Sequence, residues 1–213
     1  MPQTVRTRHG KSKMKRQLAI GSLVVLGLLS GVASAEEKKA RRYEVQTPRS
    51  SVPAGAASIK VSASIDVVRQ VVTDFGNYAD SIKRFEKAKV IGRHGDQTDV
   101  YLQVPILKGA SKIWAVVRFD APKPAPGGNG EIIVGRMIKG NVKRLDARWS
   151  LVKVDEGTTN LDLEILLVPD SVIPIPNSLV IDESKYAAAK GVEGILLKSE
   201  RISAEAGRRT AAN

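Results

Sequence analysis

The side chains of this chain that could carry out chemistry are few and far apart. Its 213 residues contain no cysteine and only two histidines. His9 stands among the basic residues at the start of the chain, and His94 stands in the turn-like sequence Gly-Arg-His-Gly-Asp. Thiol chemistry and disulfides are therefore excluded, and one remaining histidine does not make a His-rich zinc site. We predict no catalytic residue, no metal site and no cofactor.

Three polar residues remain as candidates for a reactive site. Asp74 and Tyr78 follow a segment with helical spacing, where a helix-terminal role and a packing role explain them more simply. Arg136 alternates with Val134 and Ile138 in a strand-like segment, so it points inward if these apolar residues do. An inward Arg136 would pair with a carboxylate or phosphate of a ligand, whereas the opposite register makes it a surface charge. An enzyme would need these polar groups to converge in one cavity.

The first 35 residues have the pattern of an export signal. Six basic residues precede an apolar stretch, Leu18 to Leu29, and the sequence Val-Ala-Ser-Ala then ends at Ala35. This A-x-A pattern of small residues is typical of a cleavage site, and the apolar stretch is short for a membrane span. We therefore predict an exported protein, periplasmic or secreted, whose mature chain begins near Glu36. The alternative is a protein anchored in the membrane by an uncleaved signal.

The positive charge of the chain belongs largely to this signal. The chain carries 34 Lys and Arg against 22 Asp and Glu, and removal of the six basic residues of the signal leaves 28 against 22. The remaining basic residues are spread along the sequence, and the few aromatic residues are not interleaved with them. No nucleic-acid partner is therefore predicted. A transient contact with an anionic membrane surface is compatible with the residual charge.

The first elements after the signal follow from changes in composition and period. Residues 36–56 are polar and contain proline and glycine without apolar periodicity, which predicts a flexible linker. Apolar and polar residues alternate in 57–63 and predict a half-buried strand. Valines at helical spacing in 67–72 predict a short helix, and residues 78–82 predict a second helical turn.

The rest of the chain predicts a sheet and one long helix. Six strand-like segments between residues 85 and 167 are joined mostly by short turns, which favours antiparallel pairing with one dry face. A proline-broken linker leads into an amphipathic helix from about Asp182 to Ala204. Residues 205–213 are predicted to be a disordered tail. The order predicts an α+β fold in which a curved antiparallel sheet of about seven strands wraps on the C-terminal helix, with two short helices after the first strand.

Three local sequences resemble those of the START-like (SRPBCC) superfamily, the helix-grip fold of polyketide cyclase/dehydrase and coenzyme Q-binding proteins. The similar pieces are IKVSASIDVVRQVVTDFGNYADSIKRF at residues 59–85, GNVKRLDARWSLVKVDEGTTNLDLEILLVP at residues 140–169, and the proline-rich passage into the last helix. The resemblance covers nearly all of the mature chain and implies a START-like helix-grip domain over residues 57–204. Its motifs are marks of the fold, and none is a catalytic signature.

The resemblance implies a cavity between the sheet and the C-terminal helix that holds a hydrophobic small molecule such as a lipid, an isoprenoid or a polyketide-like compound. The aliphatic character of the predicted inward faces agrees with such a site. The same alternation also fits a solid core, so a protein-interaction module and an enzyme of cyclase or hydrolase type are the alternatives. A monomer is favoured, and the oligomeric state is left open. The residues predicted to contact the ligand are Val100, Leu102, Val104, Ile113, Ala115, Val117, Val134, Arg136, Ala147, Trp149, Leu161, Leu163, Ile165, Ala188, Val192, Ile195 and Leu196.

Overall fold

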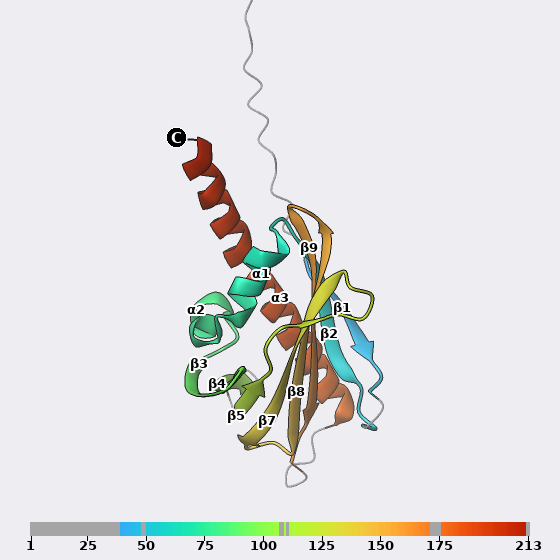
Figure 1. Cartoon of the computed structure of the whole chain (residues 1–213). Helices are drawn as coiled ribbons and strands as arrows, with labels where there is room; N and C mark the ends of the chain where they lie inside the picture. Colours follow the sequence, from blue (N-terminus) through green and yellow to red (C-terminus); the bar gives the residue numbers. More distant parts are fainter. Residues whose placement is uncertain (1–38, 48–49, 107–108, 110, 171–175, 212–213) are drawn as a thin grey trace, which may run out of the picture. The chain divides into compact units, whose positions relative to one another are not determined.

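Two layers make up the folded part of the chain, an antiparallel sheet and the helices that cover one of its faces (Figure 1). The computed structural model describes residues 39–47, 50–106, 109, 111–170 and 176–211. The predicted signal peptide lies outside these residues. We call the face of the sheet toward the helices the inner face and the opposite one the outer face.

The sheet contains nine strands in the order β1-β2-β9-β8-β7-β5-β4-β3, with β6 paired to β7 beside this path. All the pairings are antiparallel. Because β2 pairs with both β1 and β9, the first two strands of the chain lie beside the last strand of the chain. The strands are β1 (Arg41–Val45), β2 (Ala54–Val61), β3 (Lys87–His94), β4 (Gln97–Ile106), β5 (Ser111–Phe119), β6 (Lys123–Pro124), β7 (Gly130–Gly140), β8 (Arg144–Asp155) and β9 (Thr158–Val168).

The helices cover the inner face because each has an apolar side. Helix α1 (Ile65–Thr73) buries valines at one side, and Ser64 occupies its N-cap position without a side-chain cap hydrogen bond. The short 3-10 turn η1 (Phe75–Asn77) and helix α2 (Tyr78–Ser81) follow directly. Helix α3 (Asn177–Ala211) packs on β2 and β9, and α1 packs against it. The predicted α+β helix-grip architecture is therefore confirmed.

The predicted flexible linker is wrong where the chain forms β1 and the beginning of β2. Residues 41–45 pair with β2, and the Tyr43 hydroxyl donates a hydrogen bond of 2.8 Å to a carboxylate oxygen of Asp162. An edge strand needs a partner on one side only, and its side chains can stay polar. The stretch 41–45 (Arg-Arg-Tyr-Glu-Val) therefore lacks the apolar alternation by which strands are recognised.

Helix α3 is longer than predicted at both ends. It begins at Asn177 and continues through Ala211, so residues 205–211, which the sequence predicts to be disordered, are helical. The last turn carries Arg208 and Arg209, whose positive charges interact favourably with the negative end of the helix dipole. No apolar face is needed for such a polar extension of an already formed helix, because each added residue adds one backbone hydrogen bond.

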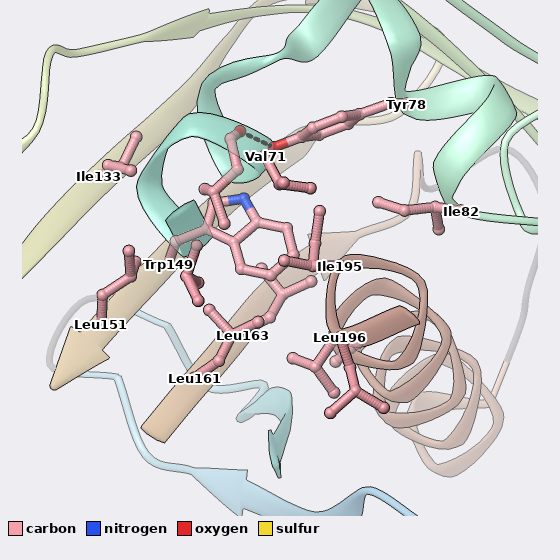
Figure 2. Packing of buried hydrophobic residues seen from close by; sticks show 14 of the residues in the cluster. Val71, Tyr78, Ile82, Ile133, Trp149, Leu151, Leu161, Leu163, Ile195 and Leu196 are labelled. Carbon is pink, nitrogen blue, oxygen red and sulfur yellow. Dashed lines mark hydrogen bonds between the residues drawn. The ribbon is translucent and has the colours of Figure 1, made fainter. Parts of the chain in front are cut away.

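The middle of the inner face is a packed core (Figure 2). Trp149 on β8 is 2% exposed and lies among Leu161 of β9, Val71 of α1 and Ile195 of α3, all of which are buried. Burying each such side chain stabilises the fold by about 1.5–3 kcal/mol. The packing fixes α1 and α3 over the sheet, and the candidate site lies beside it.

Candidate functional site

A cavity lies beside this core, between the inner faces of β4, β5, β8 and β9 and the first half of α3. Its volume is about 110 Å³. One water molecule needs about 10–15 Å³ on this measure, so the hollow is much larger than a packing defect. The side chains that line it are almost all aliphatic or aromatic. The inner face therefore contains both a solid core and a cavity.

The predicted ligand-contacting residues divide between these two regions. Eight of them line the cavity, namely Leu102, Val104, Ile113, Ala115, Ala147, Trp149, Leu163 and Ile165. Seven others do not line the cavity and are buried in the packed core, namely Val100, Val117, Leu161, Ala188, Val192, Ile195 and Leu196. The periodicity of the sequence assigned these residues to the correct face of the strand or helix. Their position along the strand or helix decides whether they line the cavity or pack in the core.

The prediction that Val134 and Arg136 face the cavity is wrong. Ile133 pairs with Trp149 and Gly135 pairs with Ala147, so these residues of β7 face inward and the alternate set faces outward. The Arg136 side chain is 64% exposed on the outer face, where it lies 3.3 Å from a carboxylate oxygen of Asp120. Both alternating sets of β7 contain apolar residues, and the inward set includes a glycine with no side chain to mark it.

The sequence did not predict which residues of α3 form the cavity wall. Ser184, Ala187 and Gly191 line the cavity at intervals of three and four residues. A Cβ atom added to Gly191 would lie 2.6 Å from Leu163 Cδ2, so the helix backbone closely approaches β9 there. Small residues at helical spacing were the available signal, because they leave space beneath a helix that a larger side chain would fill.

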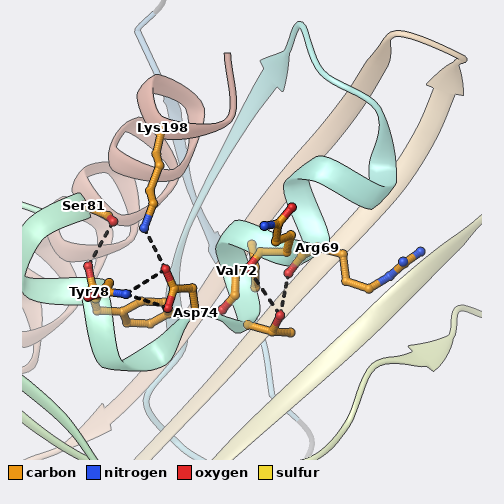
Figure 3. Close-up of polar contacts among 9 residues, drawn as sticks. Arg69, Val72, Asp74, Tyr78, Ser81 and Lys198 are labelled. Carbon is orange, nitrogen blue, oxygen red and sulfur yellow. Dashed lines mark hydrogen bonds and ion pairs between the residues drawn. The ribbon is translucent and has the colours of Figure 1, made fainter. Parts of the chain in front are cut away.

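The polar candidates of the sequence do not meet in the cavity. The Asp74 carboxylate ends α1, where it accepts hydrogen bonds from Asn77 Nδ2 at 2.9 Å and Lys198 Nζ at 2.8 Å (Figure 3). Tyr78 lines the cavity, but its hydroxyl donates to the Val72 carbonyl at 2.6 Å. Because Arg136 lies on the outer face, the three groups do not form one reactive site.

Burial controls the chemistry of the Tyr78 hydroxyl. Its side chain is 2% exposed, and burial raises the pKa of the phenol far above its ordinary value. A hydrogen bond with Trp149 opposes this pKa shift to a smaller extent. The phenol therefore stays protonated at neutral pH and serves as a fixed hydrogen-bond donor. Its edge-on contact with Trp149, with ring centroids 6.4 Å apart, helps to hold the indole at the boundary of the cavity.

One ion pair lies in the cavity wall, between Arg84 of the α2–β3 connection and Glu183 of α3. The side chains are 18% and 28% exposed, respectively. The Arg84 guanidinium also lies 5.0 Å from the centre of the Tyr186 ring, a distance at which cation–π attraction is favourable. These contacts fix the guanidinium beside an otherwise apolar space.

Neither a metal centre nor a membrane span is found in the part of the chain that the structure describes. No three His, Cys, Asp or Glu side chains of that part are grouped so that they could hold a metal ion. Its helices also include none that is both long and apolar enough to cross a membrane.

Comparison with solved structures identifies the fold. No protein-family model and no curated protein sequence matches the chain. A STAR-related lipid transfer protein from Xanthomonas axonopodis is similar with a TM-score of 0.63 and 14% identity, over 76% of this chain and 93% of that one. Human STARD10 is similar with a TM-score of 0.57 and 10% identity, over 81% of this chain and 78% of that one.

An aromatase/cyclase is also among the similar structures. Zhui from Streptomyces sp. R1128 has a TM-score of 0.53 and 20% identity, over 76% of this chain and 95% of that chain. The folded part of this chain thus has a START-like helix-grip fold, which lipid transfer proteins and cyclases share. At these identities the likeness establishes the fold.

Proposed function

We propose that this protein is an exported binding protein that holds a hydrophobic small molecule in the cavity between the sheet and α3. The observation that carries this proposal is the apolar cavity itself, which a well-packed domain of this size would otherwise fill. A ligand that moves its apolar surface from water into such a space gains about 25 cal/mol for each Å² buried. A lipid, an isoprenoid or a polyketide-like compound has suitable chemistry.

Export of the protein rests on the sequence of its first 35 residues, with a basic segment, a short apolar stretch and the A-x-A pattern. Strand β1 begins at Arg41, so cleavage before Glu36 would leave every described strand in the mature chain. Fractionation of cells that express the full chain, with an intact mass of the product, tests this part of the proposal. We expect a product outside the cytoplasm whose mass corresponds to a chain that begins at Glu36. A full-length product in the membrane fraction would contradict cleavage.

Binding is tested by native mass spectrometry of the protein expressed with its signal and purified without detergent. We expect a bound hydrophobic molecule at close to one per protein, which organic extraction then identifies. The matched variant is Ala147→Leu, which places a larger side chain in the cavity, and the control is Ala204→Leu at an exposed position of α3. The extracted molecule should be lost from the first variant and kept by the second.

A clean unliganded mass contradicts the proposal if it persists after incubation with a panel of lipids and isoprenoids. Equal amounts of ligand on Ala147→Leu and the unchanged protein would also contradict it, because the ligand would then lie elsewhere. Folding of both variants is checked by thermal unfolding, so that loss of ligand is not confused with loss of structure.

A further inference from the structure

The outer face of the sheet differs in charge between its two halves. On β8 and β9 the cations have acidic neighbours. Arg144 pairs with Asp146 at 2.5 Å, and Arg148 lies 4.0 Å from Glu164. The half formed by β3, β4, β5 and β7 lacks this balance, and it carries aromatic side chains as well.

Two aromatic rings stand at the centre of this second half. Tyr101 of β4 and Trp114 of β5 are stacked, with ring centroids 6.2 Å apart and an interplanar angle of 23°. Both side chains are partly exposed. They point outward because the next residues of their strands, Leu102 and Ala115, line the cavity on the inner face. The outer face therefore presents two rings that each join an apolar body to a polar tip.

Hydrogen bonds hold this ring pair in place. The Trp114 N–H donates to Asn141 Oδ1 at 2.9 Å, and the Trp114 carbonyl accepts from the Asn141 N–H at 3.2 Å. The Tyr101 hydroxyl donates to Gln103 Oε1 at 2.9 Å. A partner that contacts the rings therefore loses little affinity to the ordering of this surface.

Lysines flank the ring pair on both sides. On β3, Lys89 lies directly opposite Tyr101, and Lys87 is the preceding residue on the same face. On β7, Lys139 lies opposite Val116, which in turn lies opposite Tyr101. All three lysines are exposed. Directly opposite residues have Cβ atoms about 4.5–5.5 Å apart, so these cations can reach a group that contacts the rings.

The lysines around the rings exceed the carboxylates available to them. Within the part of the chain that the structure describes, Lys89 and Lys139 form no ion pair. Glu86 pairs with Lys112 at 2.7 Å. The hydrogen bond from Lys112 is the main cause that holds the pKa of Glu86 below its usual range, and the charge of Lys87 adds to it. Four lysines thus share one glutamate, an excess of three positive charges.

We propose that the patch formed by Tyr101, Trp114 and these four lysines is a docking surface for an anionic lipid bilayer. The lysine ammonium groups meet the lipid phosphates, and the rings lie at the level of the head groups, where Trp and Tyr are favoured. This inference goes beyond the proposed function, because none of these residues lines the cavity.

An exposed aliphatic residue favours a bilayer over a soluble polyanion as the partner. The register between β5 and β7 shifts after Val116, and the shift leaves Ile138 as an extra residue of β7 beside Lys139. Ile138 is 51% exposed. An isoleucine side chain gains from contact with the acyl chains of a lipid surface, whereas a soluble polyanion offers it no apolar partner.

Sedimentation with vesicles tests the proposal. Residues 36–213 are used, because they include every described strand and helix and lack the basic signal, which would itself bind anionic vesicles. The vesicles contain phosphatidylcholine alone or equal parts of phosphatidylcholine and phosphatidylglycerol. Each basic residue near an anionic surface raises the affinity about fivefold, so an excess of three charges should favour the mixed vesicles about a hundredfold. Added salt should reduce this preference.

Two double variants with the same loss of charge locate the surface. Lys89→Gln with Lys139→Gln should lower the affinity for the mixed vesicles about twenty-five-fold. The control is Lys60→Gln with Arg208→Gln, which removes two exposed cations on β2 and near the end of α3. Its affinity should fall by less than about fivefold, the contribution of one contacting residue. Thermal unfolding checks that both variants are folded.

Fluorescence shows whether Trp114 reaches the bilayer. The chain contains two tryptophans, so Trp149→Phe leaves Trp114 as the only emitter. Its emission should shift to the blue on the mixed vesicles and be quenched by brominated phosphatidylcholine. If Trp149→Phe does not fold, protection of the unchanged protein from acrylamide quenching is measured instead. Trp149 is 2% exposed, so such quenching reports mainly on Trp114.

The outcomes decide between the possible partners. Equal binding to the two kinds of vesicle overturns the proposal, as does a loss in the patch variant no larger than in its control. If the two lysines matter but the Trp114 emission is unchanged and dextran sulfate binds equally well, the surface recognises soluble polyanions and the bilayer proposal is wrong. Each of these failures leaves the proposed binding in the cavity intact, because that function is tested by the extracted ligand.

Discussion

The two halves of the inner face differ in what α3 places opposite the sheet. Over the packed core, α3 presents Val192, Ile195 and Leu196, which meet β-strand residues such as Leu161 and leave no space. Over the cavity, the same helix presents Ser184, Ala187 and Gly191. The sheet residues of the two halves are alike in size and polarity. Larger helix side chains therefore fill space over the core that Ser184, Ala187 and Gly191 leave open over the cavity, although Ala188 and Ala189 of the core half are small as well.

Matched leucine truncations on β9 test this contrast with the largest expected effect. Leu161 and Leu167 lie on the same face of one strand, Leu161 in the packed core and Leu167 at the cavity. Leu161→Ala should lower the free energy of unfolding by about 2–5 kcal/mol, because it creates a hole in packed surroundings. Leu167→Ala should cost about 1 kcal/mol, because part of its surface already faces space.

Urea unfolding of the two variants measures these losses. Equal losses at both positions would show that the cavity is closed in solution and that the inner face is solid throughout. A larger loss at Leu167 would reverse the assignment of the two halves.

The spacing between α3 and the sheet is the second test. A Cβ atom added to Gly55 on β2 would lie 2.4 Å from the backbone nitrogen of Lys185, so only glycine allows this approach of helix and strand. Gly55→Ala should push the first half of α3 outward and lower the free energy of unfolding by about 1–3 kcal/mol. Ligand binding should persist, because the cavity is widened rather than filled.

The control for this variant is Gly157→Ala in the exposed β8–β9 turn, where an added Cβ atom meets its nearest neighbour, an Asp155 oxygen, at 3.9 Å. A loss of ligand in Gly55→Ala with the fold intact would mean that a tight fit of α3 is needed for binding.

Filling the cavity should separate stability from binding. Ala147→Leu adds buried apolar atoms in a space that the protein leaves open, so it should raise the free energy of unfolding of the unliganded protein by about 0.5–2 kcal/mol. The same substitution at Ala189, which is fully buried in the packed core, should destabilise the protein by overpacking. Thermal unfolding after removal of bound ligand gives both values. Destabilisation of similar size in both variants would contradict the presence of free space at Ala147.

A third region, the outer face, provides the smallest effect and a reference for the other two. The Asp99 carboxylate accepts hydrogen bonds of 2.7 and 2.8 Å from Arg118, with His94 Nε2 at 3.1 Å. The Arg118 hydrogen bonds are the largest cause that holds the pKa of Asp99 below its usual range. A carboxylate with a lowered pKa in the folded state contributes stability above its unfolded pKa of about 3.9, and this stability is lost as the pH falls through the folded value.

Asp99→Asn should therefore lower stability at pH 7, and this deficit relative to the unchanged protein should shrink as the pH is lowered to about 2. Ligand affinity should not change, because Asp99 lies on the face away from the cavity. Unfolding by urea at several pH values measures the effect, with Asp96→Asn in the exposed β3–β4 turn as the control. A pH-independent deficit would show that the hydrogen-bond geometry, and not the carboxylate charge, is what matters.

The sequence predicts the architecture of this domain well because its inner strands alternate cleanly. Residues such as Leu145, Ala147 and Trp149 face the helices as predicted, since one wet and one dry face require it. Strand β1 was missed because a charged edge strand has no dry face. The orientation of β7 was not predictable from its two apolar sets, one of which includes Gly135.

The position of the cavity was only half predictable. Ala115 and Ala147 were predicted to contact a ligand and do line the cavity, whereas Ala188, predicted likewise, is fully buried without lining it. The alternation of a strand identifies the side on which a residue lies. Whether that residue packs against another side chain depends on how a second strand or helix is placed opposite it. The local sequence carries no information on that placement. Arg84 was missed for the same reason, since its partner Glu183 lies on α3.

The pairing of β2 with β9 has a consequence for the order in which this protein can fold. Gly55 lies opposite Ile165 and Val61 lies opposite Thr159, so the second strand of the sheet requires the last one. Such long-range pairing is slow to form, because a large loop must close before any contact repays the lost entropy. A chain that leaves the ribosome with its N-terminus first cannot complete this sheet until β9 has been synthesised. The topology thus delays completion of the sheet until the whole domain has been synthesised, although β1 and β2 can pair earlier.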